Sequence, residues 1–401
     1  MSITGRLLSI RASLHILIGA ALFAIPVLTL WNLAVERTQP NWKVTFGGAL
    51  GGVTAAAPAL QWSWGSLVDG SLQRQIGAMI TDAMPLRPLL IRLSNEFRYT
   101  FFGEYNSPTL VAGRSGQLIL DYAYDEYCSR RADSTPPMHR DFISNLRAIQ
   151  DYYRQLNRVF LFLVTPSKIA HMPENFVDST NCKNNPGDRA AKLTAWTRIL
   201  NDAGINHFDG ASYIHALRGR YPIELFPPRG LHWNALGAAH AAQALTTEIN
   251  RSAGRPLLRP FTFNYELMNR AYGTDRDLAD LANLLVPRVR YPTPYVTFQP
   301  STPCDFRAGP IVNVALVGSS FLGQLSEAMV AAACLRRLNF YLYLVRARYS
   351  YNDGVVTEKI GLDDADIAPV RDADIVILEE NENALGEGNY IEKLWDMLSR
   401  R

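Results

Sequence analysis

Two segments of the sequence carry side chains that could perform nucleophilic chemistry, and the first is centred on a pair of serines. Residues 311–325, IVNVALVGSSFLGQL, begin with a short apolar, β-branched run that predicts a buried strand ending at Gly318. Ser319 and Ser320 follow, and apolar residues then recur at helical spacing. Such a turn holds a hydroxyl above the carboxyl edge of a parallel sheet, where a helix N-terminus stabilises a developing anion. One of the two serines is therefore the candidate nucleophile, and a purely structural turn is the alternative.

The second segment supplies a histidine that could act as the base a serine nucleophile needs. His232 lies in a stiff loop, FPPRGLHWN at residues 226–234, that ends at a candidate helix N-cap, Asn234. We expect this loop and the serine turn to meet at one edge of the sheet. Each of the other histidines is expected to be an ordinary side chain, in the apolar N-terminal segment or in helices and loops without a supporting motif: His15, His139, His171, His207, His215 and His240.

These segments resemble the motifs of a known family. The sequence G-S-S-F at residues 318–321 resembles the nucleophile block G-D-S-F of SGNH hydrolases, and H-W-N at residues 232–234 resembles part of the D-x-H-W block of the AlgX and AlgJ type alginate O-acetyltransferases. Residues 110–118 and T-P-S-K at residues 165–168 are similar to two further segments of that family. The four motifs follow the family's order and touch most of residues 62–401.

The resemblance implies a reaction and roles for two residues. Ser320 matches the nucleophile, which would attack an acetyl donor, and His232 matches the base that would take the hydroxyl proton. The resulting acetyl-serine would pass its acyl group to a sugar hydroxyl, and the Ser320 backbone N–H would be one oxyanion donor. Residues 379–383, EENEN, could help to bind substrate at another carboxyl edge of the sheet, or form a solvated acidic loop.

The sequence departs from the family where an acid should orient the histidine. The family's aspartate two residues before the histidine is Gly230 here, and the position three before, which other SGNH enzymes use, is Arg229. Loss of such a carboxylate costs on the order of 10⁴-fold in a serine triad. Another carboxylate could substitute, a Ser-His dyad could suffice, or the chemistry could be lost. By position, Asp209 is the first candidate for the catalytic acid, and Glu224 is the second.

The N-terminal region predicts a membrane anchor. Residues 13–35, SLHILIGAALFAIPVLTLWNLAV, are apolar over about the length that crosses a bilayer. Arg6 and Arg11 precede them, so residues 1–12 are predicted to be a cytoplasmic tail and the rest of the chain to lie outside. A cleaved signal peptide is the alternative, although residues 32–34 fit a cleavage site poorly. We therefore expect a single-pass inner-membrane protein with a periplasmic or otherwise extracytoplasmic catalytic domain, where disulfides can form.

The remaining chain predicts one large domain. Residues 36–61 are rich in Gly, Ala and Thr and are expected to be a spacer before a domain over residues 62–401. Helical and strand patterns then alternate, which favours an α/β, three-layer, SGNH-hydrolase-like domain with a mainly parallel sheet, preceded by one N-terminal transmembrane helix. Beside the strand before Gly318, the expected strands are residues 159–164, 340–345, 374–378 and a short one near His207. The expected helices are residues 142–156, 188–200 and 235–249, with a hairpin at 109–112 and 117–120 and an irregular Pro-rich region at 255–310.

Composition limits the other classes of function. The 401 residues carry a net charge of +3, so no basic surface for nucleic acid is expected. There is no Gly-rich nucleotide loop and no CxxC spacing, and we predict neither a cofactor nor a metal site. The four cysteines allow three pairings. Nearest neighbours would join Cys128 to Cys182 and Cys304 to Cys334, but the sequence does not choose between them.

The predicted function is therefore O-acetylation of hydroxyls on a secreted or cell-surface polysaccharide acceptor. Acyl-CoA is not expected outside the cell, so the resemblance implies a multi-spanning membrane-bound O-acyltransferase partner as the acetyl donor. A polysaccharide acetyl esterase is the nearest alternative, because water can resolve the same acyl-enzyme. A non-catalytic polysaccharide-binding scaffold is the other, since seven Trp and eighteen Tyr residues are available to stack on sugars.

Overall fold

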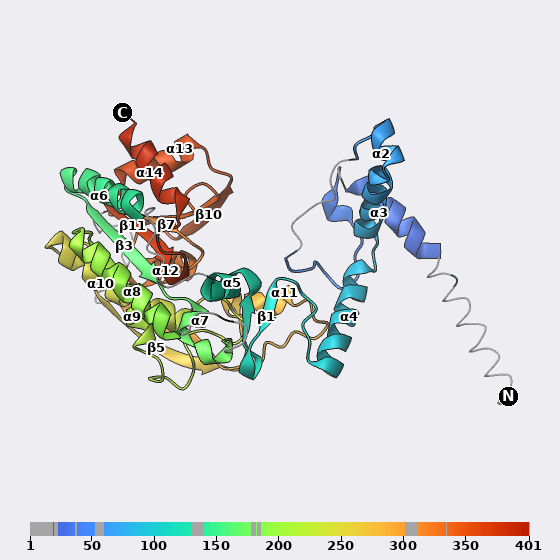
Figure 1. Cartoon of the computed structure of the whole chain (residues 1–401), viewed down its shortest axis with the longest axis horizontal. Coiled ribbons are helices and arrows are strands. Elements are labelled where there is room, and N and C mark those ends of the chain that lie inside the picture. Colours follow the sequence, from blue (N-terminus) through green and yellow to red (C-terminus); the bar gives the residue numbers. More distant parts are fainter. Residues whose placement is uncertain are drawn as a thin grey trace. The chain divides into compact units, whose positions relative to one another are not determined.

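The computed structural model describes residues 19, 23–36, 38–52, 60–129, 139–177, 182, 186–300, 311–333 and 335–400. The chain divides into two compact units (Figure 1). The first comprises residues 1–107 and 279–288, and the second comprises residues 108–278 and 289–401. Residues 62–107, which the sequence analysis included in one domain over residues 62–401, thus group with the N-terminal segment.

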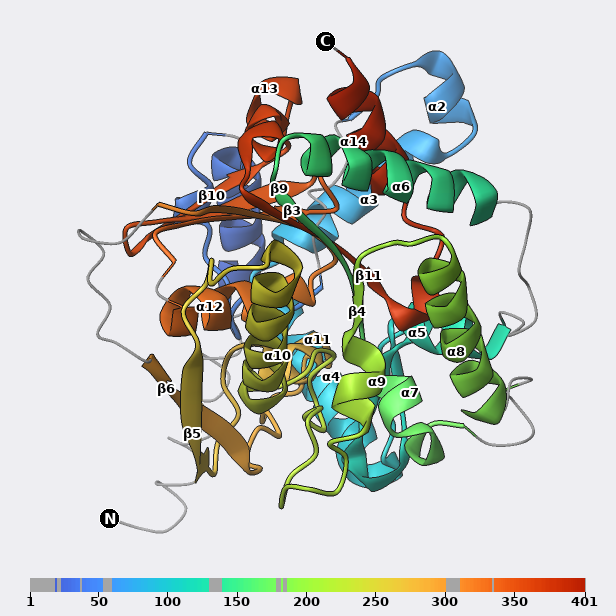
Figure 2. The same cartoon turned by 90° about the vertical axis from the view of Figure 1, so that its left-hand side faces the viewer.

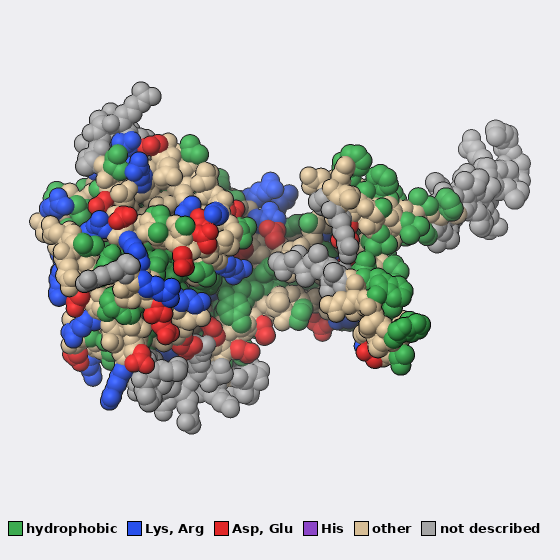
Figure 3. Space-filling model, turned by 90° about the horizontal axis from the view of Figure 1, so that it is seen from above, with side chains coloured by type: hydrophobic (Ala, Val, Ile, Leu, Met, Phe, Trp, Pro, Cys, Tyr) green, Lys and Arg blue, Asp and Glu red, His purple; other side chains and the backbone are tan. Residues whose placement is uncertain are grey.

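The first unit is built from short amphipathic helices: α2 (Trp64–Val68), α3 (Ser71–Ala83) and α4 (Arg87–Phe102). A capping box between Ser63 and Ser66 begins α2. The unit leaves many large apolar side chains exposed, and they gather on its surface in Figure 3, in contrast to the charged surface of the second unit. The most exposed in α2 to α4 and just before them are Trp62, Trp64, Val68, Phe97, Phe101 and Phe102.

The predicted membrane anchor is only partly described. The cytoplasmic tail, residues 1–12, and much of the anchor at residues 13–35 lie outside the described residues, while residues 23–35 are helical. Over the part of the chain that the structure describes, no helix combines the length and apolarity that a membrane crossing requires. The anchor therefore stays a prediction. In the predicted spacer, residues 36–61, the only regular element of the described part is η1 (Pro40–Trp42), and residues 53–59 lie outside it.

The second unit contains the mainly parallel sheet that the sequence predicted. Its strand order is β10-β9-β8-β7-β11-β3-β4, and the five strands from β8 to β4 run parallel. The hairpin of β9 and β10 adds two antiparallel strands at the β8 edge. The strand bounds are β3 (Val159–Thr165), β4 (His207–Asp209), β7 (Asn313–Gly318), β8 (Arg337–Leu342), β9 (Ala347–Asn352), β10 (Val355–Ile360) and β11 (Ile375–Asn381).

Helices cover both faces of this sheet, so the predicted three-layer architecture is confirmed (Figure 2). Alternate residues of each strand face opposite layers. Leu161 and Leu316 pack in the layer that contains α10 and α12, whereas Phe162 and Val317 pack in the layer that contains α6 and α14. The longer helices are α5 (Asp121–Ser129), α6 (His139–Gln155), α8 (Pro186–Asp202), α10 (Ala235–Ala253), α12 (Leu322–Ala333) and α14 (Asn389–Ser399).

The structure contains two hairpins that the sequence analysis did not predict and one that it did. The region at 255–310, predicted to be irregular, contains β5 (Phe261–Met268) paired antiparallel with β6 (Thr293–Pro300). Its alternating burial, with Phe261 buried and Thr262 exposed, is the ordinary pattern of a half-covered hairpin. β9 and β10 were not anticipated, although Asp353 and Gly354 between them, both at positive φ, form a usual hairpin turn. The predicted hairpin is present as β1 (Leu110–Ala112) and β2 (Leu118–Leu120).

A disulfide joins Cys128 at the end of α5 to Cys182. This is the first of the two pairs that nearest-neighbour spacing suggested. The second pair, Cys304 and Cys334, lies outside the described residues. The bond restrains the end of α5, a helix that borders the cavity described below.

Candidate active site

The serine turn stands at the carboxyl end of β7, between two parallel neighbours, β8 and β11. The strand ends at Gly318, and α12 begins at Leu322. Gly318 has to be a glycine, because a Cβ there would lie 2.8 Å from the Cβ of Glu379 and closer still to its carboxylate. The absence of a side chain thus lets the serine turn lie directly on β11.

The structure brings Ser320 and His232 together. The Nε2 atom of His232 lies 2.8 Å from the Oγ atom of Ser320, which is hydrogen-bond distance. His232 comes from the loop before α10, whose first turn is capped by the Asn234 side chain accepting from the Gly237 N–H. Two loops separated by 88 residues therefore meet at one edge of the sheet, as the sequence analysis expected.

The acid beside the imidazole is Asp277, which sequence reasoning missed. Its Oδ2 atom lies 3.0 Å from Nδ1 of His232, and its Oδ1 atom accepts a hydrogen bond of 3.0 Å from the Leu231 N–H. Asp277 begins the short helix α11 (Asp277–Leu281), directly after η4 (Gly273–Arg276). One carboxylate thus contacts both the histidine ring and the backbone of the loop that carries it.

Asp209, the predicted catalytic acid, does not lie beside His232. It ends β4, three strand positions from β7, which is about 14 Å at the usual strand spacing. Its carboxylate caps α9 (Gly210–His215) by accepting from the Ser212 N–H at 2.8 Å, and it also accepts from the Thr197 hydroxyl. Glu224, the second candidate, lies 3.6 Å from His171 instead. Asp277, rather than either of these two residues, is therefore the carboxylate that lies beside His232.

Gly230 explains why the family's acid is missing from the usual place. A Cβ at residue 230 would lie 2.6 Å from the backbone oxygen of Thr274 and 2.9 Å from the carbonyl carbon of Asp275. The segment that delivers Asp277 fills the space that a side chain at residue 230 would need. A glycine at residue 230 thus both lacks the family's carboxylate and leaves the space in which the segment carrying Asp277 packs.

Lys168, in the predicted T-P-S-K segment, holds the histidine loop in place. Its side chain is 1% exposed, and its Nζ atom donates to the carbonyl oxygens of Leu118, Pro227, Pro228 and Gly230 at 2.7–2.9 Å. Burial lowers the pKa of this amine well below its usual range. The contacts tie the loop before His232 to strand β2.

We therefore expect Lys168→Met to loosen this region. Four buried carbonyls would lose their shared donor, and a buried polar group without its partner costs about 1–3 kcal/mol. The free energy of unfolding, measured in urea, should fall by about 3 kcal/mol or more. The exposed Lys393→Met is the matched control and should change it by less than about 0.5 kcal/mol. Equal effects of the two changes would contradict the role assigned to Lys168.

Two buried glutamates lie under the serine turn, where a solvated acidic loop was the alternative reading. Glu379 is fully buried and accepts from the Ser319 N–H at 2.6 Å, from the Ser319 hydroxyl at 3.0 Å and from the Thr165 hydroxyl. Burial raises its pKa in spite of these donors. Glu380 accepts from the Gly386 and Gly388 N–H groups, and burial raises its pKa to about 8. These carboxyls shape the turn and its surroundings, and they are not solvated.

Asp275, two residues before Asp277, is also buried. Burial and the nearby charge of Asp277 raise the pKa of Asp275 to about 7. The folded chain therefore holds a proton on this side chain at pH values where the unfolded chain, with a pKa near 4, has released it. The contribution of Asp275 to the free energy of unfolding is therefore smallest above pH 7, and it grows as the pH falls from 7 towards 4.

Replacing Asp275 by asparagine should accordingly flatten the dependence of stability on pH. Between pH 4 and 7 the wild-type chain should lose a few kcal/mol of unfolding free energy through this residue, since one pKa unit is worth about 1.4 kcal/mol. Urea unfolding of Asp275→Asn at several pH values should show a shallower slope. The exposed Asp202→Asn should keep the wild-type slope. An unchanged slope in Asp275→Asn would show that the carboxyl is ionised in the folded chain.

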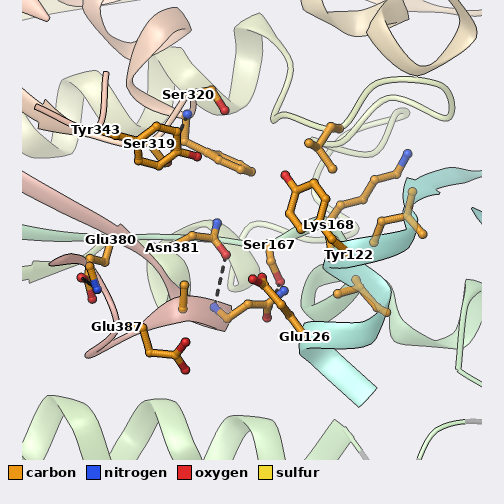
Figure 4. Close-up of a pocket in the computed structure, with 18 of the residues that line it drawn as sticks. Tyr122, Glu126, Ser167, Lys168, Ser319, Ser320, Tyr343, Glu380, Asn381 and Glu387 are labelled. Atoms are coloured by element: carbon orange, nitrogen blue, oxygen red, sulfur yellow. Dashed lines mark hydrogen bonds between the residues drawn. The ribbon is translucent and has the colours of Figure 1, made fainter. Parts of the chain in front are cut away.

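A cavity of about 320 Å³ opens beside the serine turn (Figure 4). Ser319 and Ser320 form one wall, α5 contributes another, and the segment from β11 to the start of α14 forms the floor. In Figure 4 the Tyr122 hydroxyl points across the cavity towards the serines, and the Asn381 amide points into it. Among the described residues, no three His, Cys, Asp or Glu side chains are grouped so that they could hold a metal ion. Ser320, whose hydroxyl lies 2.8 Å from the His232 imidazole, is on the wall of this cavity.

Taken with the sheet topology, this edge of the molecule defines an SGNH-hydrolase-like α/β protein. The chain belongs to the family described as ALGX, SGNH hydrolase-like domain, acetyltransferase AlgX, which matches residues 124–336, just over half of the chain. The match contains His232, Asp277 and Ser320. It thus assigns the chain to a family of acetyltransferases, as the motifs indicated.

Solved structures with similar folds include two Pseudomonas proteins and one from Bacillus. The O-acetyltransferase domain of Pseudomonas putida AlgJ is 18% identical, covers 73% of this chain and 100% of its own, and has a TM-score of 0.44. Pseudomonas aeruginosa AlgX is 15% identical over 76% of this chain and 72% of its own, with a TM-score of 0.46. Bacillus cereus PatB1 with a sulfonyl adduct is 9% identical over 71% and 99%, with a TM-score of 0.44. No curated protein sequence matches the chain. No residue role in this chain follows from likenesses at this level.

Proposed function

We propose that this protein is an O-acetyltransferase that carries an acetyl group on Ser320 and transfers it to hydroxyls of a secreted or cell-surface polysaccharide. The observation that carries the proposal is the hydrogen-bonded line from Ser320 through His232 to Asp277, in a chain that belongs to an acetyltransferase family. A serine, an imidazole and a carboxylate in this order form the arrangement that activates a hydroxyl for acyl transfer.

Each member of the line has a separate role in the proposed reaction. His232 takes the proton from the Ser320 hydroxyl as the oxygen attacks the acetyl donor, and it returns a proton to the leaving group. Asp277 keeps the Nδ1 proton of the imidazole on its own side, so that Nε2 faces the serine as an acceptor, and it stabilises the imidazolium that forms. The Ser320 N–H at the start of α12 would donate to the oxyanion.

The experiment follows the fate of the acetyl group. The full chain, purified in detergent, is mixed with p-nitrophenyl acetate and an oligosaccharide acceptor. Acetylated oligosaccharide as the main product supports transfer, whereas release of acetate alone identifies an acetyl esterase. If neither product forms and no acetyl group appears on the protein by mass spectrometry, the chain acts as a non-catalytic, polysaccharide-binding subunit.

We further propose that the protein works at the outer side of the inner membrane with a multi-spanning O-acyltransferase as its acetyl donor. The apolar residues 13–35 and the exposed apolar side chains of the first unit support this place, since large uncovered apolar patches usually contact lipid or protein. Fractionation of cells that express the full chain, followed by protease treatment of spheroplasts, tests it. Protein in the soluble fraction would contradict the proposal.

A further inference from the structure

Helix α4 directs polar side chains into its own unit and leaves large apolar ones exposed. Asn95 is buried, and its amide donates to the Ala282 carbonyl oxygen at 3.1 Å. Glu96 accepts from the Arg288 guanidinium and from the Val286 N–H. The side of the helix away from Asn95 carries four exposed apolar side chains, which we call the apolar stripe of α4: Leu90, Leu93, Phe97 and Phe101.

The apolar stripe is continuous along the helix. Its residues follow one another at intervals of three and four, so they lie within about 80° of the helix surface and along about 17 Å of its length. The ring centroids of Phe97 and Phe101 are 4.7 Å apart. A helix that faces water on one side ordinarily carries polar side chains there. The stripe therefore indicates that α4 has an apolar neighbour outside the unit.

The helical segment at residues 23–35 has the same arrangement. Its Asn32 is 1% exposed, and the side-chain amide donates to the Ala83 and Val44 carbonyl oxygens, both at 2.8 Å. Its exposed side carries apolar residues: Phe23, Val27, Leu30 and Trp31. Ala83 is the last residue of α3. The apolar residues 13–35, which the sequence predicts to cross a bilayer, thus end in a helix that is bonded to the core of the first unit.

The tryptophans of the first unit favour lipid as the neighbour. Four of them are between 44% and 84% exposed: Trp31, Trp42, Trp62 and Trp64. By contrast, Trp196 and Trp233 in the second unit are buried. Tryptophan is enriched where a bilayer meets water, because its ring is apolar and its N–H is polar. These side chains, the apolar stripe and the end of the predicted anchor belong to one unit. A bilayer is the apolar neighbour that residues 13–35 bring to this unit.

We infer that the first unit binds the surface of the bilayer and that the apolar stripe of α4 inserts into the lipid, as a second membrane contact beside residues 13–35. The inference rests on the proposed place of the protein at the inner membrane. The second contact would restrain the orientation of the first unit at the membrane, which a single flexible tether would not do. It also gives a reason for the exposure of apolar side chains in a unit whose polar groups are paired internally.

The test places a photo-crosslinker on the stripe. The full chain, with Phe97→benzoylphenylalanine or Phe101→benzoylphenylalanine, is reconstituted in vesicles of phosphatidylethanolamine and phosphatidylglycerol and then irradiated. Tyr295→benzoylphenylalanine is the matched control, because it puts the same group at an exposed aromatic position on β6 of the second unit. Mass spectrometry identifies what the probe has joined. We expect phospholipid adducts at positions 97 and 101 to exceed those at position 295 by about tenfold or more.

Flotation of the vesicles before irradiation separates the inference from the proposal on which it rests. A chain that does not float with the vesicles would contradict the place at the membrane, and the inference with it. A chain that floats but forms no more lipid adduct at positions 97 and 101 than at position 295 would overturn the inference alone. A crosslink from the stripe to a second copy or to the chain's own second unit would also overturn it, because protein rather than lipid would then cover α4. In native membranes, a crosslink to another protein in place of lipid would have the same meaning.

Discussion

Replacing Ser320 by alanine is expected to abolish formation of the acyl-enzyme. The Oγ atom of Ser320 is the group within hydrogen-bond distance of His232, and alanine removes it without adding volume. With p-nitrophenyl acetate, the wild-type protein should gain one acetyl mass on the peptide that contains Ser320, and the variant should gain none. Transfer to an oligosaccharide should fall by about 10³-fold or more, the range seen when a serine triad loses a member.

The neighbouring serine provides the control. The Ser319 hydroxyl donates to the buried Glu379 rather than to the histidine, so Ser319→Ala should keep the acetyl mass on the peptide. Because both serines lie on one peptide, fragmentation must locate the modification. Acetyl found on Ser319, or full transfer activity in Ser320→Ala, would remove Ser320 from the reaction.

Replacing Asp277 by asparagine is expected to have the second largest effect. An amide in this position would donate to Nδ1 of His232, which forces the remaining ring proton onto Nε2, where it faces the serine. The imidazole could then no longer accept the hydroxyl proton, and it would lose the charge that stabilises imidazolium. The rate of acyl-enzyme formation should fall by about 10³–10⁴-fold while the fold is retained. The burst of p-nitrophenol, followed by stopped flow, measures this rate.

Asp209→Asn is the matched comparison, because it makes the same chemical change at the residue that sequence position favoured. Asp209 caps α9, so the variant should lose about 1 kcal/mol of stability and little of its acylation rate. A large loss of rate in Asp209→Asn, with Asp277→Asn near wild type, would return the role of the acid to Asp209. Circular dichroism of both variants separates loss of chemistry from loss of fold.

The layers of the second unit followed from local patterns. The buried run at β3 and the helical periodicity of α6 and α10 are properties of short windows of sequence, and they predicted elements within a few residues of those observed. The predicted strand at 340–345 ends earlier, at Leu342, because Tyr343 and Leu344 adopt positive φ angles. A change to positive φ angles at two apolar residues does not alter the pattern of apolar residues, so the sequence pattern did not reveal where the strand ends.

The cavity floor shows where local patterns were insufficient. The end of β11 and the residues that follow it, 379–383, are rich in acidic and amide residues and resemble an exposed loop in composition. Glu379 and Glu380 are buried because they find N–H and O–H donors from the serine turn, β3 and Gly386 to Gly388. Burial of a carboxyl depends on such partners, and those of Glu379 come from segments about 60 and 214 residues away in the chain. No window of sequence around Glu379 contains them.

The sequence by itself located the serine and the histidine that the structure brings together, and it predicted the class of fold, because each depends on a motif or a period within one segment. It also indicated, through Gly230, that no acid stands in the usual place. Only the tertiary structure showed which carboxylate lies beside the imidazole. Asp277 lies 45 residues after His232 in a region without regular periodicity, and it reaches the imidazole because Gly230 leaves room for its segment. Asp277 lies beside His232 because distant segments pack together, and a pattern within one segment of sequence does not encode that packing.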